Sequence, residues 1–238
     1  MSRQSVRPSF THAGCLLGAR FILPVLPGVC VFASAFGTAA AQKGLTLWQA
    51  LSMSAFVYAG ASQMVALELW RETWSPTTVL GLMAVTGTVN ARMILMGAAI
   101  QPWLAEAPKL QNGVNLFFFT DANWLIGTRY HGEGGSDLGV MFGAGFVLWN
   151  AWIIATLPGF MAGALVTEPA RYGIDLVMPI FFSAMIVPLW KGFAPARPWA
   201  VAGIVALAVE DVAPGYLFII AGSLAGALMG ALMKDANE

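Results

Sequence analysis

Charged side chains are scarce in this chain of 238 residues. Twelve basic and twelve acidic residues make up 10% of the sequence, whereas a soluble domain carries about a quarter. Cysteine is rare as well, with two residues, and the formal net charge is zero. These shortages exclude a highly charged disordered chain and a disulfide scaffold. A chain without net charge also lacks the counterion-release term on which nucleic-acid binding depends, so we expect no nucleic-acid partner.

Motifs for several kinds of catalysis are absent too. The sequence contains no G-x-x-x-x-G-K-[ST] loop for ATP hydrolysis. The two histidines, His12 and His131, form no H-E-x-x-H metal site and lie outside the apolar segments. Cys15 and Cys30 lack the C-x-x-C spacing of redox or zinc sites. We therefore expect no enzyme activity, no catalytic residues, no bound metal and no cofactor.

Apolar residues dominate what is present, at 58% of the chain. Crossing the hydrocarbon core of a membrane takes about 20 apolar residues per helix, so eight spans would use roughly 160 residues. The sequence therefore predicts an all-α polytopic membrane protein, a single domain built as a bundle of about eight transmembrane helices. The predicted spans are 21–41, 46–70, 77–100, 112–128, 139–165, 174–190, 199–213 and 214–233.

Three of these spans are short and contain Asp121, Pro179 or Glu210. Seven spans, or re-entrant half-helices, therefore remain alternatives to eight.

Basic residues favour one orientation. With the N-terminus inside the cell, eight basic residues lie on the cytoplasmic side and three on the outer side. The inner set is Arg3, Arg7, Arg20, Arg71, Arg129, Lys191, Arg197 and Lys234, and the outer set is Lys43, Lys109 and Arg171. Because basic residues near span ends favour the cytoplasm, we predict that both termini are cytoplasmic and that residues 1–20 form a cytoplasmic arm.

Arg92 and Asp121 are the charges predicted to lie deep within spans. Arg92 precedes the outer end of the third span by eight residues, and Asp121 lies nine residues into the fourth. At about 1.5 Å per residue, both are about 12 to 14 Å from that end. Two interpretations stay open. The pair could be a neutralised staple between neighbouring helices, or it could line a polar cavity that binds a charged substrate group or moves a proton.

Small residues and amides surround these charges in the segments Gly60-Ala-Ser-Gln63 and Asn90-Ala-Arg92. Gly60 and Ser62 would let helices approach closely while Gln63 and Asn90 bond across the interface. Alternatively, the small residues make room for a ligand and the amides orient it, as at unwound transporter helices.

Helix interruptions are predicted at Pro24, Pro27 and Pro179, because proline removes a helical hydrogen bond and frees a carbonyl group. Such breaks often mark transporter binding sites, although ordinary kinks are common. Glycines at four-residue spacing permit close helix crossings at Gly139 and Gly143, Gly159 and Gly163, and Gly222, Gly226 and Gly230. The last strip would dock either a neighbouring span or a separate membrane subunit.

Four segments together resemble the AzlC family, the large subunits of bacterial branched-chain amino acid permeases. They are Ser54 with Tyr58-Ala-Gly-Ala-Ser-Gln63, Val89-Asn-Ala-Arg-Met-Ile-Leu-Met96, Phe119-Thr-Asp121 and Gly173-Ile-Asp-Leu-Val-Met-Pro179. The resemblance covers roughly residues 20–233. The chain departs from the family at Met93, where histidine is frequent, and at Ala122, where an acidic residue is frequent.

The resemblance implies a secondary transporter of the bacterial inner membrane that exports valine, leucine or isoleucine by alternating access, together with a small AzlD-type membrane subunit. Arg92, Asp121, Asn90, Gln63, Ser62 and Gly60 are the candidate substrate or coupling residues. The alternatives are a channel, a structural subunit without its own substrate site, or the membrane component of an ATP-driven importer, for which the short loops show no coupling helix.

Overall fold

The computed structural model describes residues 9–70, 75–105, 107–166, 192–213 and 217–235, together with the single positions 171, 176, 183 and 190. Every named element in these ranges is helical, and their one β-contact is an isolated bridge between Ser9 and Asp137. This confirms the predicted all-α fold.

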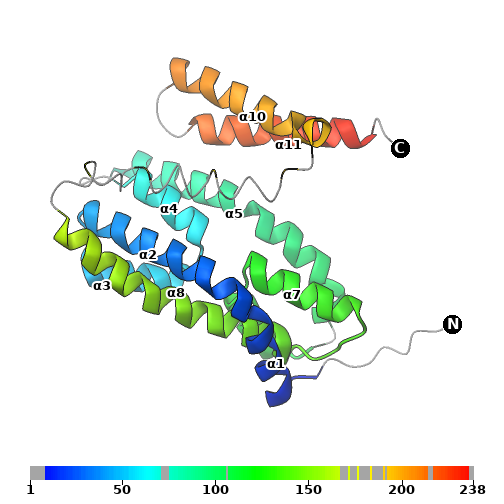
Figure 1. Ribbon diagram of the computed structural model, residues 1–238. Helices are drawn as coiled ribbons and strands as arrows, with labels where there is room; N and C mark the ends of the chain where they lie inside the picture. The colour runs from blue at the N-terminus through cyan, green and yellow to red at the C-terminus, as the bar shows by residue number, and fades with distance from the viewer. Residues whose placement is uncertain are drawn as a thin grey trace. The chain divides into compact units, whose positions relative to one another are not determined.

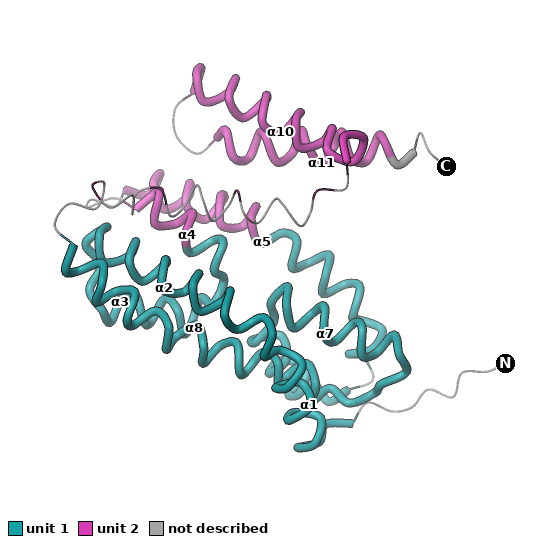
Figure 2. The backbone as a smooth tube through the Cα atoms, in the orientation of Figure 1, with its two compact units in different colours: residues 1–63, 90–169 teal, residues 64–89, 170–238 magenta. Residues whose placement is uncertain are grey.

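The chain divides into two compact units, drawn in teal and magenta in Figure 2. The first comprises residues 1–63 and 90–169, and the second comprises residues 64–89 and 170–238.

The first unit contains most of the helices. In chain order they are α1 (His12–Ile22), the 3-10 turn η1 (Leu23–Val25), α2 (Leu26–Gln42), α3 (Leu47–Ser52), the π-helical turn η2 (Met53–Val57), α6 (Lys109–Phe117), α7 (Asp121–Gly132) and α8 (Gly139–Leu165). Two further helices cross the boundary between the units: α4 (Gly60–Glu68) begins in the first unit and α5 (Pro76–Leu104) ends in it.

Helix α8 is the scaffold of the first unit, because it packs along α1 and α2 and also contacts α3, η2, α6 and α7 (Figure 1). The crossing with α2 needs Gly159, where an added methyl group would collide with the Ser34 carbonyl. Hydroxyl groups bond across the same interface: Ser34 Oγ donates to the Ala155 carbonyl at 3.0 Å, and Thr38 Oγ1 to the Gly159 carbonyl at 2.9 Å. Small residues and hydroxyls thus join these helices, as is usual inside membranes.

Helix α1 begins at His12, earlier than the predicted first span, within the segment predicted to be an arm. Thr11 caps it by accepting a hydrogen bond from the Gly14 amide at 2.9 Å. The Asp137 carboxylate accepts one from the Thr11 amide at 3.1 Å and one from the Gly139 amide at 2.8 Å. One carboxylate therefore serves the starts of both α1 and α8, and this pairing holds the chain in a helix upstream of residue 21.

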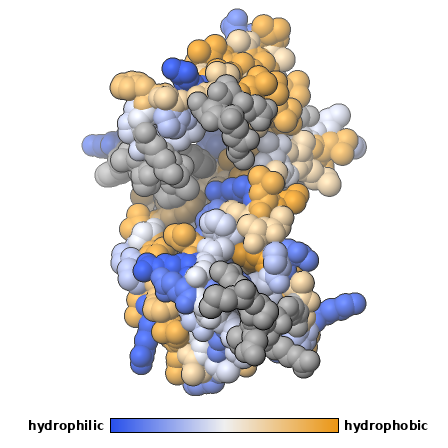
Figure 3. All heavy atoms as spheres, turned by 90° about the vertical axis from the view of Figure 1, so that its right-hand side faces the viewer, coloured by the Kyte–Doolittle hydropathy of each residue, from blue (hydrophilic) through white to orange (hydrophobic). Residues whose placement is uncertain are grey.

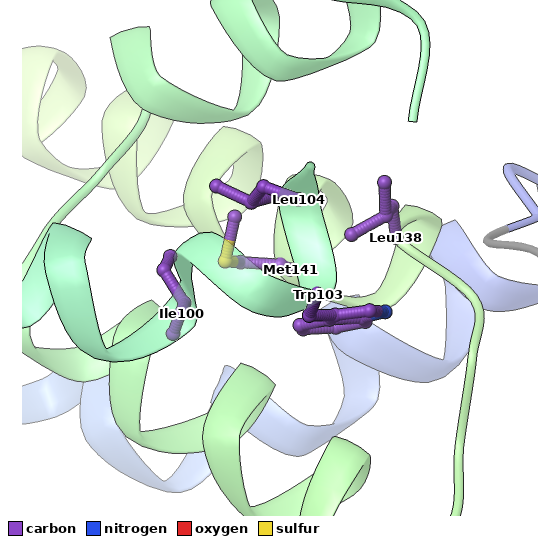
Figure 4. Packing of buried hydrophobic residues seen from close by; sticks show 5 residues of the cluster. All are labelled: Ile100, Trp103, Leu104, Leu138 and Met141. Carbon is purple, nitrogen blue, oxygen red and sulfur yellow. The ribbon is translucent and has the colours of Figure 1, made fainter. Parts of the chain in front are cut away.

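A small apolar cluster closes the same end of the first unit. Figure 4 shows its members, which come from the last turns of α5 and the start of α8. They are Ile100, Trp103, Leu104, Leu138 and Met141. Their burial fixes the C-terminal end of α5, and with it the register of the residues that precede it.

The second unit contains the hairpin of α10 (Phe193–Val212) and α11 (Leu217–Asp235), which pack side by side (Figure 1). The glycine strip of α11 faces α10: a methyl group at Gly222 would lie 2.8 Å from the Ala202 carbonyl oxygen, and one at Gly226 would lie 3.0 Å from that of Pro198. Of the two predicted uses, the strip serves contact with a neighbouring helix.

Four helical segments are long and apolar enough to cross a membrane: residues 12–42, α5, α8 and α10. Large apolar side chains lie exposed along them, and Figure 3 shows such side chains (orange) over much of the face in view. This outward exposure suits contact with lipid.

The helices differ from the predicted spans in two ways. The second and fourth spans, predicted as continuous, are each interrupted, by η2 with Tyr58–Ala59 and by Phe118–Thr120. The interruption in the first helix is η1, which contains Pro24, whereas Pro27 lies in the first turn of α2, where a missing amide hydrogen costs little. The predicted break at Pro179 lies outside the described residues, as does nearly all of the sixth span.

Candidate functional site

The first helix break separates α3 from α4. The backbone widens into a π-helical turn at η2 and then reverses at Tyr58, whose φ of 44° and ψ of 42° are left-handed. Tyr58 is the one non-glycine residue with positive φ in the described part of the chain. Such a conformation is costly for a bulky side chain, so surrounding contacts must impose it.

Those contacts come from α8. The Trp149 indole donates to the Ala55 carbonyl at 2.9 Å, which satisfies a group that the π-helical turn leaves open. The hydroxyls of Ser54 and Thr156 lie 2.9 Å apart, and Tyr58 Oη donates to the Gly145 carbonyl at 3.4 Å. The break is therefore bonded to the scaffold helix at three levels.

Helix α4 starts beyond this break with three of the predicted site residues. Gly60 fits against aromatic rings, since a methyl group there would lie 2.7 Å from Trp152 Cη2 and 2.9 Å from Phe32 Cε1. Close packing therefore accounts for Gly60. Ser62 Oγ lies 3.0 Å from the Ala59 carbonyl oxygen.

Gln63 is the anomaly at the start of α4. Its side chain has no exposed surface, and neither its Oε1 nor its Nε2 has a hydrogen-bond partner among the described residues. Buried amides are almost always bonded, so an unbonded one calls for an explanation. A ligand group that both accepts and donates hydrogen bonds would satisfy it.

The second break separates α6 from α7 at Phe118–Thr120. Thr120 and Asn123 form a capping box: the Thr120 amide donates to Asn123 Oδ1 at 2.7 Å, and the Asn123 amide donates to Thr120 Oγ1 at 3.5 Å. Asn123 Nδ2 also donates to the Phe118 carbonyl at 2.8 Å. Asn123 is fully buried, so one amide both starts α7 and holds the preceding turn open.

Asp121 is the first residue of α7 and forms an ion pair with Arg92 of α5. Arg92 Nη2 lies 3.0 Å from Asp121 Oδ2, and the two side chains are 41% and 51% exposed. A helix N-terminus favours the carboxylate electrostatically. The structure thus brings together the two charges that the span count placed at similar depth, and because neither charge is sealed in packing, both are open to a ligand.

Asn90 of α5 bonds to α4 rather than to α7. Its Oδ1 lies 3.2 Å from Ser62 Oγ. Since Asn90 and Arg92 are two residues apart, the helix places them on different faces of α5. The predicted residues thus form two pairs, Ser62 with Asn90 and Arg92 with Asp121, with α5 between the breaks.

Both breaks meet α8 at one residue. An added methyl group at Gly145 would lie 2.5 Å from Asn123 Nδ2 and 2.7 Å from the Phe118 carbonyl oxygen, and the Gly145 carbonyl accepts the bond from Tyr58. The two interruptions are therefore connected through a single turn of the scaffold helix.

Several of these residues could not be found from prolines or intramembrane charges. The Thr120-x-x-Asn123 spacing is a capping signal that the sequence does carry. No comparable signal precedes Tyr58. Within the described ranges, no group of three His, Cys, Asp or Glu side chains could hold a metal ion.

Comparisons with known proteins agree with this architecture. A family model described as AzlC protein matches residues 24–166. A Helicobacter pylori protein named uncharacterized membrane protein is 25% identical over 180 residues, covering 71% of this chain and 72% of its own. An Archaeoglobus fulgidus protein of the same name is 26% identical over 215 residues, covering 89% and 92%. No solved structure matches the chain.

Proposed function

The chain belongs to the AzlC family, and we propose that it is a secondary transporter that exports branched-chain amino acids. Membership in the family and the similarity to membrane proteins support a role in membrane transport. The observation that carries the finer proposal is the half-exposed ion pair of Arg92 with Asp121, at a residue where a broken helix restarts.

An ion pair of this kind matches a zwitterion. The guanidinium of Arg92 can bind a carboxylate through two parallel hydrogen bonds, and the carboxylate of Asp121 can bind an ammonium group. An α-amino acid carries both groups on one carbon atom, so a single molecule can insert between the two side chains and exchange partners with each. No net charge then enters the membrane, which avoids the cost of an unpaired ion.

Side-chain specificity would come from apolar surroundings. Beside the second break, the ring of Phe118 packs edge to face against Phe146 and Trp149, with centroid separations of 5.7 Å to each. An aliphatic branched tail gains by leaving water for such a surface, whereas a charged tail loses its hydration.

The unpartnered Gln63 amide supports a second contact at the start of α4, where the preceding residue Ser62 bonds to Asn90 of α5. In the proposed cycle, α4 and α7 tilt about their breaks to expose the site alternately to either side. The proposal includes an inner-membrane location, cytoplasmic termini and a small AzlD-type membrane subunit.

Efflux measurements test the site directly. Cells fed a valine-containing dipeptide should lose valine efflux when Arg92→Ala or Asp121→Asn replaces the native residue, with the protein still present in the membrane. Arg129→Ala is the matched control, because Arg129 of α7 forms an exposed ion pair at 2.9 Å with Glu133, four residues along the chain. Full efflux in both variants would contradict the assignment of Arg92 and Asp121 as substrate-binding residues.

A transporter must also be told from a channel. In proteoliposomes, valine uptake should saturate and be competed by leucine, with and without a co-expressed small subunit. Linear flux without competition would indicate a pore, and absence of flux for every branched-chain amino acid in both preparations would contradict the proposed substrate.

A further inference from the structure

Helix α6 buries its polar face and exposes its apolar face. Leu110 is 80% exposed, and Leu116 and Phe117 are also exposed, whereas Asn115 has no exposed surface. A helix on a soluble protein does the reverse. On the polar face, Asn115 is buried, whereas Gln111 and Asn112 are half-buried.

Three amide oxygens on this face have no donor. They are Gln111 Oε1, Asn112 Oδ1 and Asn115 Oδ1, all buried and unbonded among the described residues. At about 100° per residue, the three side chains fall within an arc of about 100° on the helix. A cluster of acceptors, rather than one stray group, therefore lies on the inner side of α6.

The amide orientations are set by their nitrogen atoms. Asn112 Nδ2 donates to the Leu104 carbonyl at 2.8 Å, and Asn115 Nδ2 donates to the Gln111 carbonyl at 3.1 Å. Exchanging oxygen and nitrogen would place two oxygens against each other. Each of these two side chains therefore has its amide oxygen free to accept a hydrogen bond or to bind a cation.

Three uncharged acceptor oxygens favour a ligand that carries a single positive charge. Divalent cations are usually bound through carboxylates, and the cluster contains none. The C-terminal end of α6, two residues beyond Asn115, adds partial negative charge. The buried indole nitrogen of Trp103 is also unbonded, and its ring stacks on His131 of α7 with centroids 4.6 Å apart.

We propose that the inner face of α6 binds a small monovalent cation through the amide oxygens of Gln111, Asn112 and Asn115. Two cations have this chemistry: Na⁺, and the ammonium group of the amino acid cargo, which donates three hydrogen bonds. Binding of the cargo's ammonium group rests on the proposed function, whereas binding of Na⁺ does not.

Ligand-dependent melting of the purified protein tests the proposal. NaCl is titrated against choline chloride at equal ionic strength, and valine is titrated against 2-hydroxy-3-methylbutanoate, which lacks the ammonium group. A cation that binds the folded but not the unfolded protein raises the melting temperature, and the rise grows with the logarithm of its concentration once that exceeds Kd. Stabilisation by Na⁺ that Asn115→Leu removes identifies the metal ion. Stabilisation by valine but not by the hydroxy acid identifies the ammonium group at α6 only where Asn115→Leu removes it, because Asp121 is also proposed to bind ammonium.

Asn115→Leu should weaken the stabilising cation about tenfold or more, because a contact to a charged partner is lost. Asn115→Asp should strengthen it by adding charge. Asn150→Leu is the matched control, since Asn150 Nδ2 makes the same bond to a carbonyl four residues back, that of Phe146, at 2.8 Å. Gln111→Met replaces Asn115→Leu if the latter does not fold.

The proposal is overturned if neither Na⁺ nor valine stabilises the wild-type protein beyond its control. It is also overturned if the α6 variants respond as Asn150→Leu does. Loss of valine transport in Arg92→Ala with unchanged stabilisation by Na⁺ would separate this site from the ion pair.

Discussion

The two helix breaks of the first unit serve the same architecture by different means. The break at Tyr58 is made by the backbone, through a π-helical turn and a left-handed residue, and it leads to the uncharged residues Ser62 and Gln63. The break at Phe118–Thr120 is made by a capping side chain, and it leads to the charged Asp121. One break presents an unbonded amide and the other an ion pair.

This difference suggests a division of roles. A cap formed by Thr120 and Asn123 restarts α7 locally, so the backbone that carries Asp121 is set mainly by its own turn. The break at Tyr58 is held by α8, through Trp149 and Thr156, so it should respond when α8 shifts. We expect the charged break to be the fixed partner in binding and the uncharged break to move more.

Gly145→Ala should have the largest effect on this comparison, because both breaks contact that residue. The new methyl group would press on Asn123 and the Phe118 carbonyl, and overpacking of this kind costs about 2 kcal/mol. Melting of the purified protein and valine efflux should both fall. Gly97→Ala is the control, as nothing lies within 4 Å of its position. If Gly145→Ala and Gly97→Ala melt and export valine equally well, Gly145 does not connect the two breaks.

Asn123→Ala should damage the charged break alone. It removes the capping box and the bond to the Phe118 carbonyl, and loss of such a cap costs about 1 to 2 kcal/mol. Cysteine labelling next to Asp121 should become faster, while labelling next to Ser62 stays unchanged. Faster labelling at both positions would show that the breaks are not independent.

Ser54→Ala should loosen the uncharged break by a smaller amount. Thr156 Oγ1 donates to the Trp152 carbonyl at 2.8 Å, which leaves Ser54 as the donor to Thr156. Hydrogen bonds between membrane helices average about 0.6 kcal/mol. The reverse labelling pattern is expected, faster at Ser62 and unchanged at Asp121. Ser223→Ala, whose hydroxyl bonds within its own helix, supplies the control.

Tyr58→Phe should have the smallest effect, because its hydrogen bond to Gly145 is long at 3.4 Å. We expect a loss of stability below about 0.5 kcal/mol and nearly normal efflux. A large loss would mean that the hydroxyl, rather than the packing of the ring, holds the left-handed backbone. Tyr130→Phe gives the background for removing a tyrosine hydroxyl.

Hydropathy and helix geometry predicted much of this fold. The limits of α8 follow from its apolar run. Counting depth along two spans placed Arg92 level with Asp121, and in the structure these two side chains form an ion pair. Prolines indicated an interruption near Pro24. These features depend on local composition or on helix periodicity, both of which the sequence states directly.

The two functional breaks could not be located in the same way. Neither contains a proline, and Tyr58 adopts its conformation because α8 bonds the turn from another part of the chain. The inward face of α6 was missed because its apolar residues satisfy a hydropathy scan whichever way they face. Long-range contacts decide the break at Tyr58 and the orientation of α6, whereas the break before α7 depends on the local cap formed by Thr120 and Asn123.

The central claim is that Arg92 and Asp121 bind the substrate rather than merely stapling two helices. The double variant Arg92→Gln/Asp121→Asn decides this, since a neutral pair of amides can still hydrogen-bond and hold the two helices together. We predict a protein that inserts and melts nearly as the wild type does but exports valine at least about 100-fold more slowly, the loss expected when two charged contacts disappear. Wild-type valine export by this variant would contradict the account.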